Sequence, residues 1–271
     1  MLMLLPPNLT LASTGLATLK LIAVANAVDS SEIFLAWIQY ARQGIFDARF
    51  DPRRTMFEPG TLAIHWLSYP RWLLFPLVIL ICAVVLLFVP WVSPGPWLAC
   101  MTAARMLLRG LGGRAGGEGA DLILSILLLC GTCFYLVPIA FVQNVLLVFI
   151  AALSMLAYAT SGVAKILNPE WRRGRTLVPV LSMEIFGCPP LAEQFRKHWR
   201  LAQAASWMVL LYECGCPVWV LISPKSCFVF ILLGVGFHLC NAAMHGLNLF
   251  VWVYLATYPS LLFVVERLHG R

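Results

Sequence analysis

The chain has 271 residues, of which 61% are hydrophobic and 11% are charged, and its formal net charge is +7. Soluble domains carry about 25% charged residues, so this composition excludes an ordinary water-soluble fold, which needs a polar surface. The apolar stretches are continuous rather than alternating, which favours membrane-spanning helices over a β-barrel. The basic residues border these stretches and therefore indicate membrane topology rather than nucleic-acid binding.

The apolar pattern predicts an all-α, polytopic transmembrane bundle of about eight helices, with a range of seven to nine. We expect residues 1–271 to form a single integral membrane domain without a soluble domain, because the longest polar stretches are too short for an independent core. In chain order, the expected spans are 13–40, 72–92, 97–111, 121–139, 144–167, 201–222, 227–244 and 247–266.

The basic residues are distributed unevenly between the two sides of such a bundle. Eight crossings place the basic segments 42–71, 105–114 and 172–200 on one side, and the other side receives little beyond Lys225 and the tail. The positive-inside rule makes the basic side cytoplasmic and places both termini outside. The first span also carries Lys20 and Asp29, so it faces the bundle or lies partly at the interface.

Lys165 is an unusual residue near the end of the fifth span. Tyr158 and Ser161 precede it by seven and four residues, so the three share one helix face. Removal from water favours the neutral form of an amine, which can then act as a base. The alternative is a lysine that extends its ammonium to the membrane surface.

A second polar stripe lies in the seventh span. His238, Asn241 and His245 step by three and four residues and would line one helix face. The stripe indicates either a functional site or hydrogen bonding between helices. The two histidines are about 10 Å apart along the axis, too far to share one ion, so we predict no metal site.

Glu213 is a carboxylate in the middle of the sixth span, where an unpaired charge is costly. We expect Glu213 to share a proton or form an ion pair with either Lys165 or His238. This contact would belong either to a functional site or to a structural bond between helices.

Cys130 and Cys133 form a C-x-x-C pair that could exchange electrons with a quinone. The alternative is that these thiols are small residues at a helix contact.

Two stretches of the sequence resemble known motifs. Residues 158–174 resemble the pattern Y-x-x-A-G-hydrophobic-x-K-L-x-x-x-W-x-x-G, with Lys165 at the lysine and with Trp171 one residue later than the pattern's tryptophan. This pattern is a motif of vitamin K-dependent γ-glutamyl carboxylase and its bacterial relatives of the HTTM family. Residues 237–259 follow the pattern F-H…G-(L/I)-x-(M/L)-F…A-x-x-P, with His238 at the histidine. Gly116, Gly117 and Asp121 resemble the family's glycine-aspartate turn, and the resemblance covers about 110–265.

The resemblance implies a membrane enzyme in which Lys165 is the base that deprotonates a reduced, vitamin K-like quinone. Oxygen then converts the quinone to a stronger base, which removes a glutamate γ-proton before CO₂ adds. By the same resemblance, His238 takes the family's Phe-His position in the same cavity. We expect His238 and the intramembrane carboxylate Glu213 to join Lys165 as catalytic residues. The cavity for substrate or cofactor is expected to be lined by Tyr158, Ser161, Trp171, Asn241 and His245.

The chain departs from the carboxylase at two points. It has Val142-Gln143-Asn144 where the carboxylase carries a functional histidine, and it lacks the large lumenal domain that binds a propeptide. The resemblance therefore favours the short bacterial relatives that mature secreted peptides. It implies a bacterial plasma-membrane location, with membrane lipid, a small precursor peptide and a companion maturation protein as partners, and no nucleic acid.

Two other functions are compatible with the sequence. One is a non-catalytic membrane scaffold or immunity protein of a peptide-toxin system. The other is a thiol–quinone redox protein that uses Cys130 and Cys133.

Overall fold

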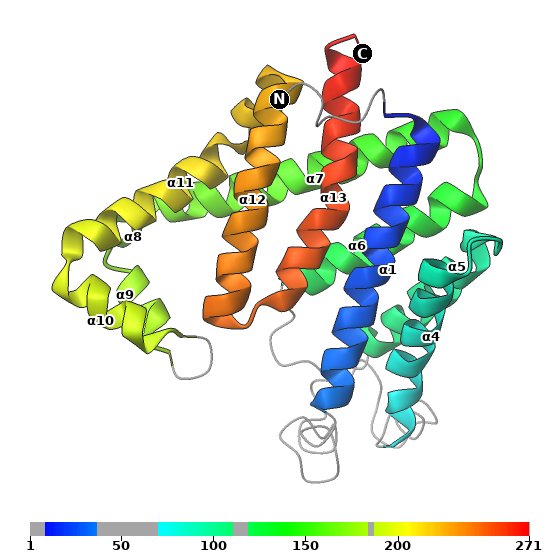
Figure 1. Ribbon diagram of the computed structural model, residues 1–271, viewed down its shortest axis with the longest axis horizontal. Helices are drawn as coiled ribbons and strands as arrows, with labels where there is room; N and C mark the ends of the chain where they lie inside the picture. The colour runs from blue at the N-terminus through cyan, green and yellow to red at the C-terminus, as the bar shows by residue number, and fades with distance from the viewer. Residues whose placement is uncertain (1–8, 37–69, 111–118, 184–186, 271) are drawn as a thin grey trace. The chain divides into compact units, whose positions relative to one another are not determined.

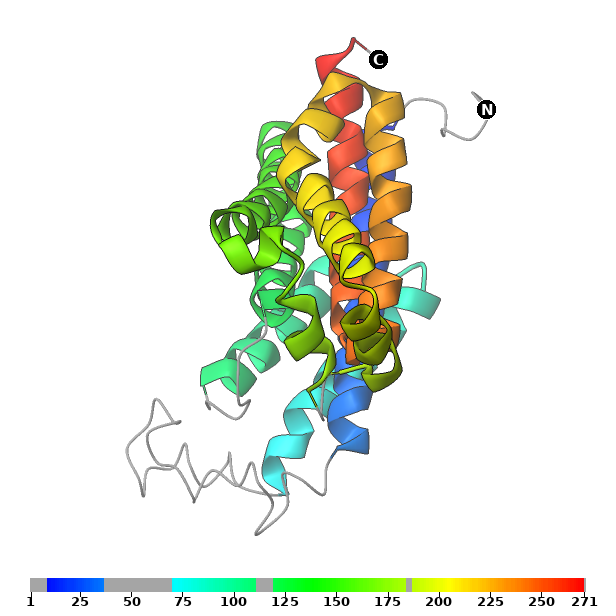
Figure 2. The ribbon, with the colours of Figure 1, turned by 90° about the vertical axis from the view of Figure 1, so that its left-hand side faces the viewer.

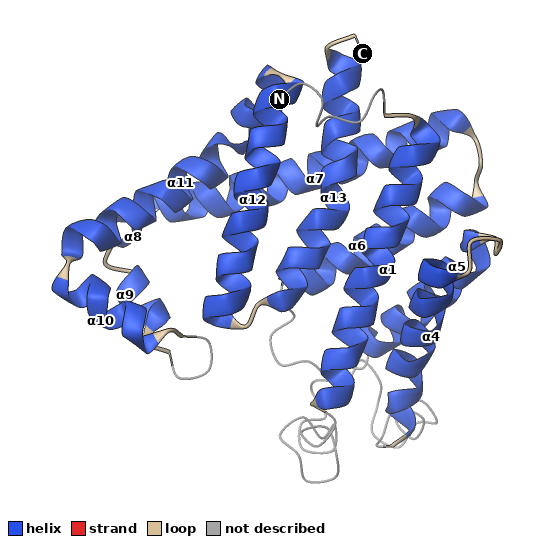
Figure 3. Cartoon of the chain, in the orientation of Figure 1, coloured by secondary structure: helices blue, strands red, loops and turns tan. Residues whose placement is uncertain are grey.

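The computed structural model describes residues 9–36, 70–110, 119–183 and 187–270. Every regular element within these ranges is a helix (Figure 3), so the predicted all-α class is confirmed. The basic residues from 42 to 69 and the glycines at 116 and 117 lie outside the described residues.

Each expected span coincides with a described helix, although the bounds differ by a few residues. These helices are α1 (Leu11–Leu35), α4 (Leu74–Phe88), α5 (Pro94–Gly110), α6 (Gly119–Leu136), α7 (Ala140–Leu167), α11 (Trp199–Ile222), α12 (Pro224–His245) and α13 (Asn248–Leu268). Among the described helices, six are long and apolar enough to cross a membrane, and α4 is a shorter apolar helix. The chain is therefore a polytopic helical membrane protein.

The described helices pack as two compact units. One unit comprises residues 15–143, which include most of α1 together with α4, α5 and α6. The other comprises residues 1–14 and 144–271, in which α11, α12 and α13 pack in sequence beside one another (Figures 1 and 2). The consecutive order of these helices follows from the short turns that join them.

The two ends of α12 show how local sequence sets the helix ends in the second unit. Ser223 and Ser226 form a capping box at the start of α12, where Pro224 occupies the first turn. The helix ends at Gly246, which has a left-handed backbone with φ of 67°. Glycine adopts this conformation without strain from a side chain, so the chain reverses there and α13 returns along α12.

The basic segment between α7 and α11 folds into three short helices, α8 (Pro169–Arg172), α9 (Leu177–Leu181) and α10 (Pro189–Lys197). Leu181 and Phe195 from α9 and α10 are buried in a small core with Ala202 of α11. On the exposed face of α10, a hydrogen bond from Arg196 lowers the pKa of the Glu193 carboxyl group. The segment is thus a polar, folded connection with its own small core.

Candidate functional site

Lys165 and Glu213 form an ion pair between the last turn of α7 and the middle of α11. The Lys165 ammonium donates to both carboxylate oxygens of Glu213, with N–O distances of 2.7 and 2.5 Å, and to the Ser161 hydroxyl at 2.6 Å. The Glu213 side chain is 5% exposed, whereas the Lys165 side chain is 21% exposed. The carboxylate is therefore enclosed, while part of the lysine remains accessible.

The pair forms because a glycine lets α7 and α11 approach each other closely. A Cβ atom added at Gly162 would lie 2.6 Å from the backbone nitrogen of Cys214 and 2.9 Å from the carbonyl carbon of Glu213. No larger residue fits there without moving one of the two backbones. Gly162 lies one residue from Ser161 and three from Lys165, so this contact fixes the distance that the lysine must span.

We expect Gly162→Leu to separate α7 from α11 and to break the Lys165–Glu213 pair. Overpacking of a tight contact costs about 1–3 kcal/mol, and the lost ion pair adds to that. Gly236→Ala is the matched control, because a Cβ atom at Gly236 meets nothing within 4 Å. Thermal unfolding of the purified protein should show a lower transition temperature for Gly162→Leu alone; equal effects of the two variants would contradict the close contact.

The connection that follows α7 holds Trp171 over the lysine. The Trp171 ring centre lies 5.5 Å from the Lys165 amine. The Trp171 carbonyl accepts a hydrogen bond of 2.5 Å from the Ser206 hydroxyl of α11. Three residues later, Gly174 has a left-handed backbone with a φ of 72°. A Cβ atom at this position would collide with the backbone of Gln203 on α11. These contacts with α11 place the tryptophan and explain the spacing of Lys165, Trp171 and Gly174.

Tyr158 and His238 form a second buried polar group two turns before Lys165 on α7. The Tyr158 hydroxyl lies 2.6 Å from His238 Nε2 and 3.0 Å from the Tyr258 hydroxyl. Both Tyr158 and His238 are buried, with 2% and 3% of their surfaces exposed. The Tyr254 ring stacks on His238 with centroids 4.3 Å apart, so α7, α12 and α13 meet at an aromatic cluster.

The structure groups the predicted site residues into these two neighbouring sets. Lys165, Glu213, Ser161 and Trp171 form the first set, and Glu213 pairs with Lys165 rather than with His238. Tyr158 and His238 belong to the second set, about 10 Å from Lys165 along α7, as the helical rise requires.

The two remaining predicted residues lie further along α12. Asn241 is half-buried and forms no hydrogen bond with the described residues, and His245 lies half-buried in the last turn of the helix. Sequence reasoning missed Tyr254 and Tyr258, although two tyrosines four residues apart in an apolar helix share one face.

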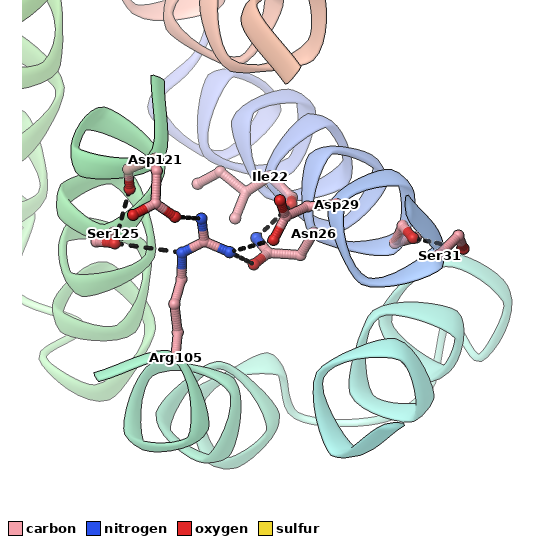
Figure 4. A network of polar contacts seen from close by, with 8 residues as sticks. Ile22, Asn26, Asp29, Ser31, Arg105, Asp121 and Ser125 are labelled. Atoms are coloured by element: carbon pink, nitrogen blue, oxygen red, sulfur yellow. Dashed lines mark hydrogen bonds and ion pairs between the residues drawn. The ribbon is translucent and has the colours of Figure 1, made fainter. Parts of the chain in front are cut away.

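A further polar cluster, centred on the charge of Arg105, lies in the unit of residues 15–143 and was not predicted. Arg105 of α5 donates to Asp29 at 2.9 Å and to Asn26 at 3.3 Å on α1, and to Ser125 at 3.2 Å on α6 (Figure 4). It also pairs with Asp121 of α6. The Arg105 side chain is only 2% exposed. Its planar guanidinium uses several donors at once and thereby joins three helices.

This cluster shows that Arg105 is buried between helices, whereas the sequence placed it among the basic residues that border a span. The residue is buried because two carboxylates from neighbouring helices compensate its charge, which the local sequence around position 105 does not reveal. Lys20 likewise points into the unit and donates to the carbonyl oxygens of Leu86 and Leu87 at 2.6 and 2.8 Å. These carbonyls belong to the last turn of α4, where a helix end attracts a cation.

Cys130 is buried and Cys133 is half-buried on α6, and both are free thiols. Within the described ranges, no group of three or more His, Cys, Asp or Glu side chains is arranged to hold a metal ion. Comparisons of the chain with protein-family models, with curated proteins and with solved structures found no match.

Proposed function

We propose that this protein is an integral membrane enzyme whose acid–base centre is the Lys165–Glu213 pair. Its substrate is a lipid-soluble quinol, a peptide or both, in the manner of the vitamin K-dependent carboxylase that its motifs resemble. The observation that carries the proposal is the accessibility of the lysine. Lys165 is 21% exposed, whereas Arg105, which contacts two carboxylates, one amide and one hydroxyl, is 2% exposed. A pair that served only to hold helices together would not need an accessible amine.

The geometry supports proton transfer at the Lys165 amine. One proton needs to move only between atoms 2.5–2.7 Å apart to convert the ion pair into a neutral amine and a neutral carboxylic acid. The neutral amine then accepts a proton from a substrate hydroxyl, while Glu213 retains the other proton. Ser161 holds the amine in position through its hydroxyl.

The residues of the site are suited to a quinol. When bound, a quinol supplies an ionisable hydroxyl group on an aromatic ring that oxygen can oxidise. Lys165 and Ser161 would hold its hydroxyl, and the Trp171 ring, 5.5 Å from the amine, offers an aromatic surface beside it. The motif resemblance alone extends this proposal to carboxylation with CO₂. It also extends it to two partners, a small precursor peptide and a companion maturation protein.

We also propose a bacterial plasma membrane as the location, with the segment 168–200 in the cytoplasm. That segment carries Arg172, Arg173, Arg175, Arg196, Lys197 and Arg200, which the positive-inside rule assigns to the cytoplasmic side. Lys165 lies two residues before the end of α7, so the acid–base centre lies toward this side of the membrane.

The proposal is tested by oxygen uptake in liposomes that contain the protein and duroquinol. We expect uptake above that of empty liposomes, and we expect Lys165→Arg to abolish the excess because a guanidinium does not release its proton. Lys225→Met removes an exposed lysine at the start of α12 and serves as the control that retains activity. A full rate in Lys165→Arg would show that the amine is not the base.

Cys130→Ser distinguishes this mechanism from thiol–quinone exchange. Both Cys130 and Cys133 lie on α6, in the unit of residues 15–143, whereas Lys165 and Glu213 belong to the other unit. We therefore expect Cys130→Ser to leave duroquinol-dependent oxygen uptake unchanged. Loss of uptake in this variant, with the protein still folded, would favour the redox alternative.

A further inference from the structure

His238 has one ring nitrogen that the fold leaves without a partner. Its Nε2 atom bonds the Tyr158 hydroxyl at 2.6 Å, but its Nδ1 atom is buried and forms no hydrogen bond with the described residues. The residue as a whole is only 3% exposed. Buried polar atoms in folded proteins are nearly always paired with protein, water or a ligand, so this nitrogen indicates a position that a further molecule fills.

A second unpartnered atom lies on the neighbouring helix. The Tyr212 hydroxyl of α11 is buried and forms no hydrogen bond of normal geometry with the described residues, although it lies close to the hydroxyls of Tyr158 and Tyr258. Its ring contacts the rings of Tyr158 and Phe237, with centroids 5.4 and 5.3 Å away. A Cβ atom at Gly234, one turn before His238, would collide with the hydroxyls of Tyr212 and Tyr258. Polar groups from the four helices α7, α11, α12 and α13 therefore converge within an aromatic environment.

We propose that His238 Nδ1 hydrogen-bonds a ring oxygen of the bound quinol or quinone, with Tyr212 beside it. This inference rests on the proposed function and adds a specific ligand contact to it. Aromatic side chains surround the position: Tyr254 stacks on the imidazole at 4.3 Å, and Phe237 lies at 5.2 Å from it. Such surroundings favour an aromatic ligand with few polar atoms over a charged one.

The Tyr158 network lets the same nitrogen serve both redox forms of the ligand. When Tyr258 donates to Tyr158 and Tyr158 donates to Nε2, the histidine proton resides on Nδ1, which can donate to a quinone carbonyl. When Nε2–H donates to Tyr158 and Tyr158 donates to Tyr258, Nδ1 is bare and accepts from a quinol hydroxyl. Both patterns use the observed oxygen–oxygen and oxygen–nitrogen distances of 3.0 and 2.6 Å.

Duroquinone binding to the purified protein tests this contact, because its fully substituted ring cannot alkylate the cysteine thiols. His238→Gln places an amide near the Nε2 position and keeps the Tyr158 bond, whereas His238→Asn keeps a polar atom near the Nδ1 position. We expect His238→Gln to bind duroquinone at least about tenfold more weakly by titration calorimetry. We expect His238→Asn to bind within about threefold of the wild-type protein.

Wild-type affinity for duroquinone in His238→Gln would overturn the proposal. A wild-type protein that binds no duroquinone would overturn it as well, because water alone would then satisfy Nδ1. Lys165→Met separates this proposal from the proposed function. It should still bind duroquinone through the His238 contact, more weakly because the Lys165 contact is lost, and it should fail to support oxygen uptake. If Lys165→Met retains uptake, the acid–base assignment fails while the His238 contact stands. If Lys165→Met is inactive and His238→Gln binds normally, only the His238 contact fails.

Discussion

Arg105→Met is expected to disrupt the packing of α1, α5 and α6. The substitution removes the guanidinium that pairs with both Asp29 and Asp121, whose side chains are 5% and 10% exposed. Removing one partner from a buried ion pair typically costs about 3–5 kcal/mol. We therefore expect a large fall in the transition temperature of the detergent-solubilised protein, or failure to accumulate in membranes.

Arg173→Met is the matched control for this prediction. Arg173 pairs with Glu170 on the surface, where the two side chains are 60% and 48% exposed, and such pairs contribute about 0–1 kcal/mol. Adding Asp29→Asn and Asp121→Asn to Arg105→Met should restore part of the lost stability, because the buried charges disappear together. Equal losses in Arg105→Met and Arg173→Met would contradict a structural role for the buried arginine.

Lys165→Met and Glu213→Gln are both expected to abolish quinol-dependent activity but to differ in their effect on stability. Lys165→Met leaves a carboxylate that is 5% exposed without its cation, whereas Glu213→Gln leaves an ammonium that is 21% exposed and can reach solvent. The free energy of unfolding should therefore fall more in Lys165→Met, by up to about 3–5 kcal/mol. Thermal unfolding and oxygen uptake on the same preparations measure both effects. Equal stability losses in the two variants would contradict this asymmetry in burial.

Much of the fold was predictable because lipid imposes a simple rule on sequence. Long apolar runs must form helices to satisfy their backbone groups, and each expected span matches a helix. The end of α12 at Gly246 likewise follows from a local property, because glycine adopts the left-handed backbone found there. Helix ends were less accurate: α12 begins at Pro224, three residues before the expected start, because a serine capping box and a proline precede the apolar run.

The charged groups were only partly predictable, because pairing depends on which helices become neighbours. Lys165 and Glu213 were each recognisable as charges within apolar sequence, and their pairing was one of two expected options. Arg105 was not recognised, because its position near the end of a short span is also typical of a topology signal. Its true environment depends on Asp29, which is 76 residues away in the chain.

The double variant Lys165→Met with Glu213→Gln most directly tests whether the pair is a reaction centre or only a structural link. Both charges are removed together, so the free energy of unfolding should stay within about 1–2 kcal/mol of the wild-type value. Oxygen uptake with duroquinol should fall to the level of empty liposomes. A folded double variant with the full wild-type rate would show that Lys165 and Glu213 join α7 to α11 and take no part in chemistry.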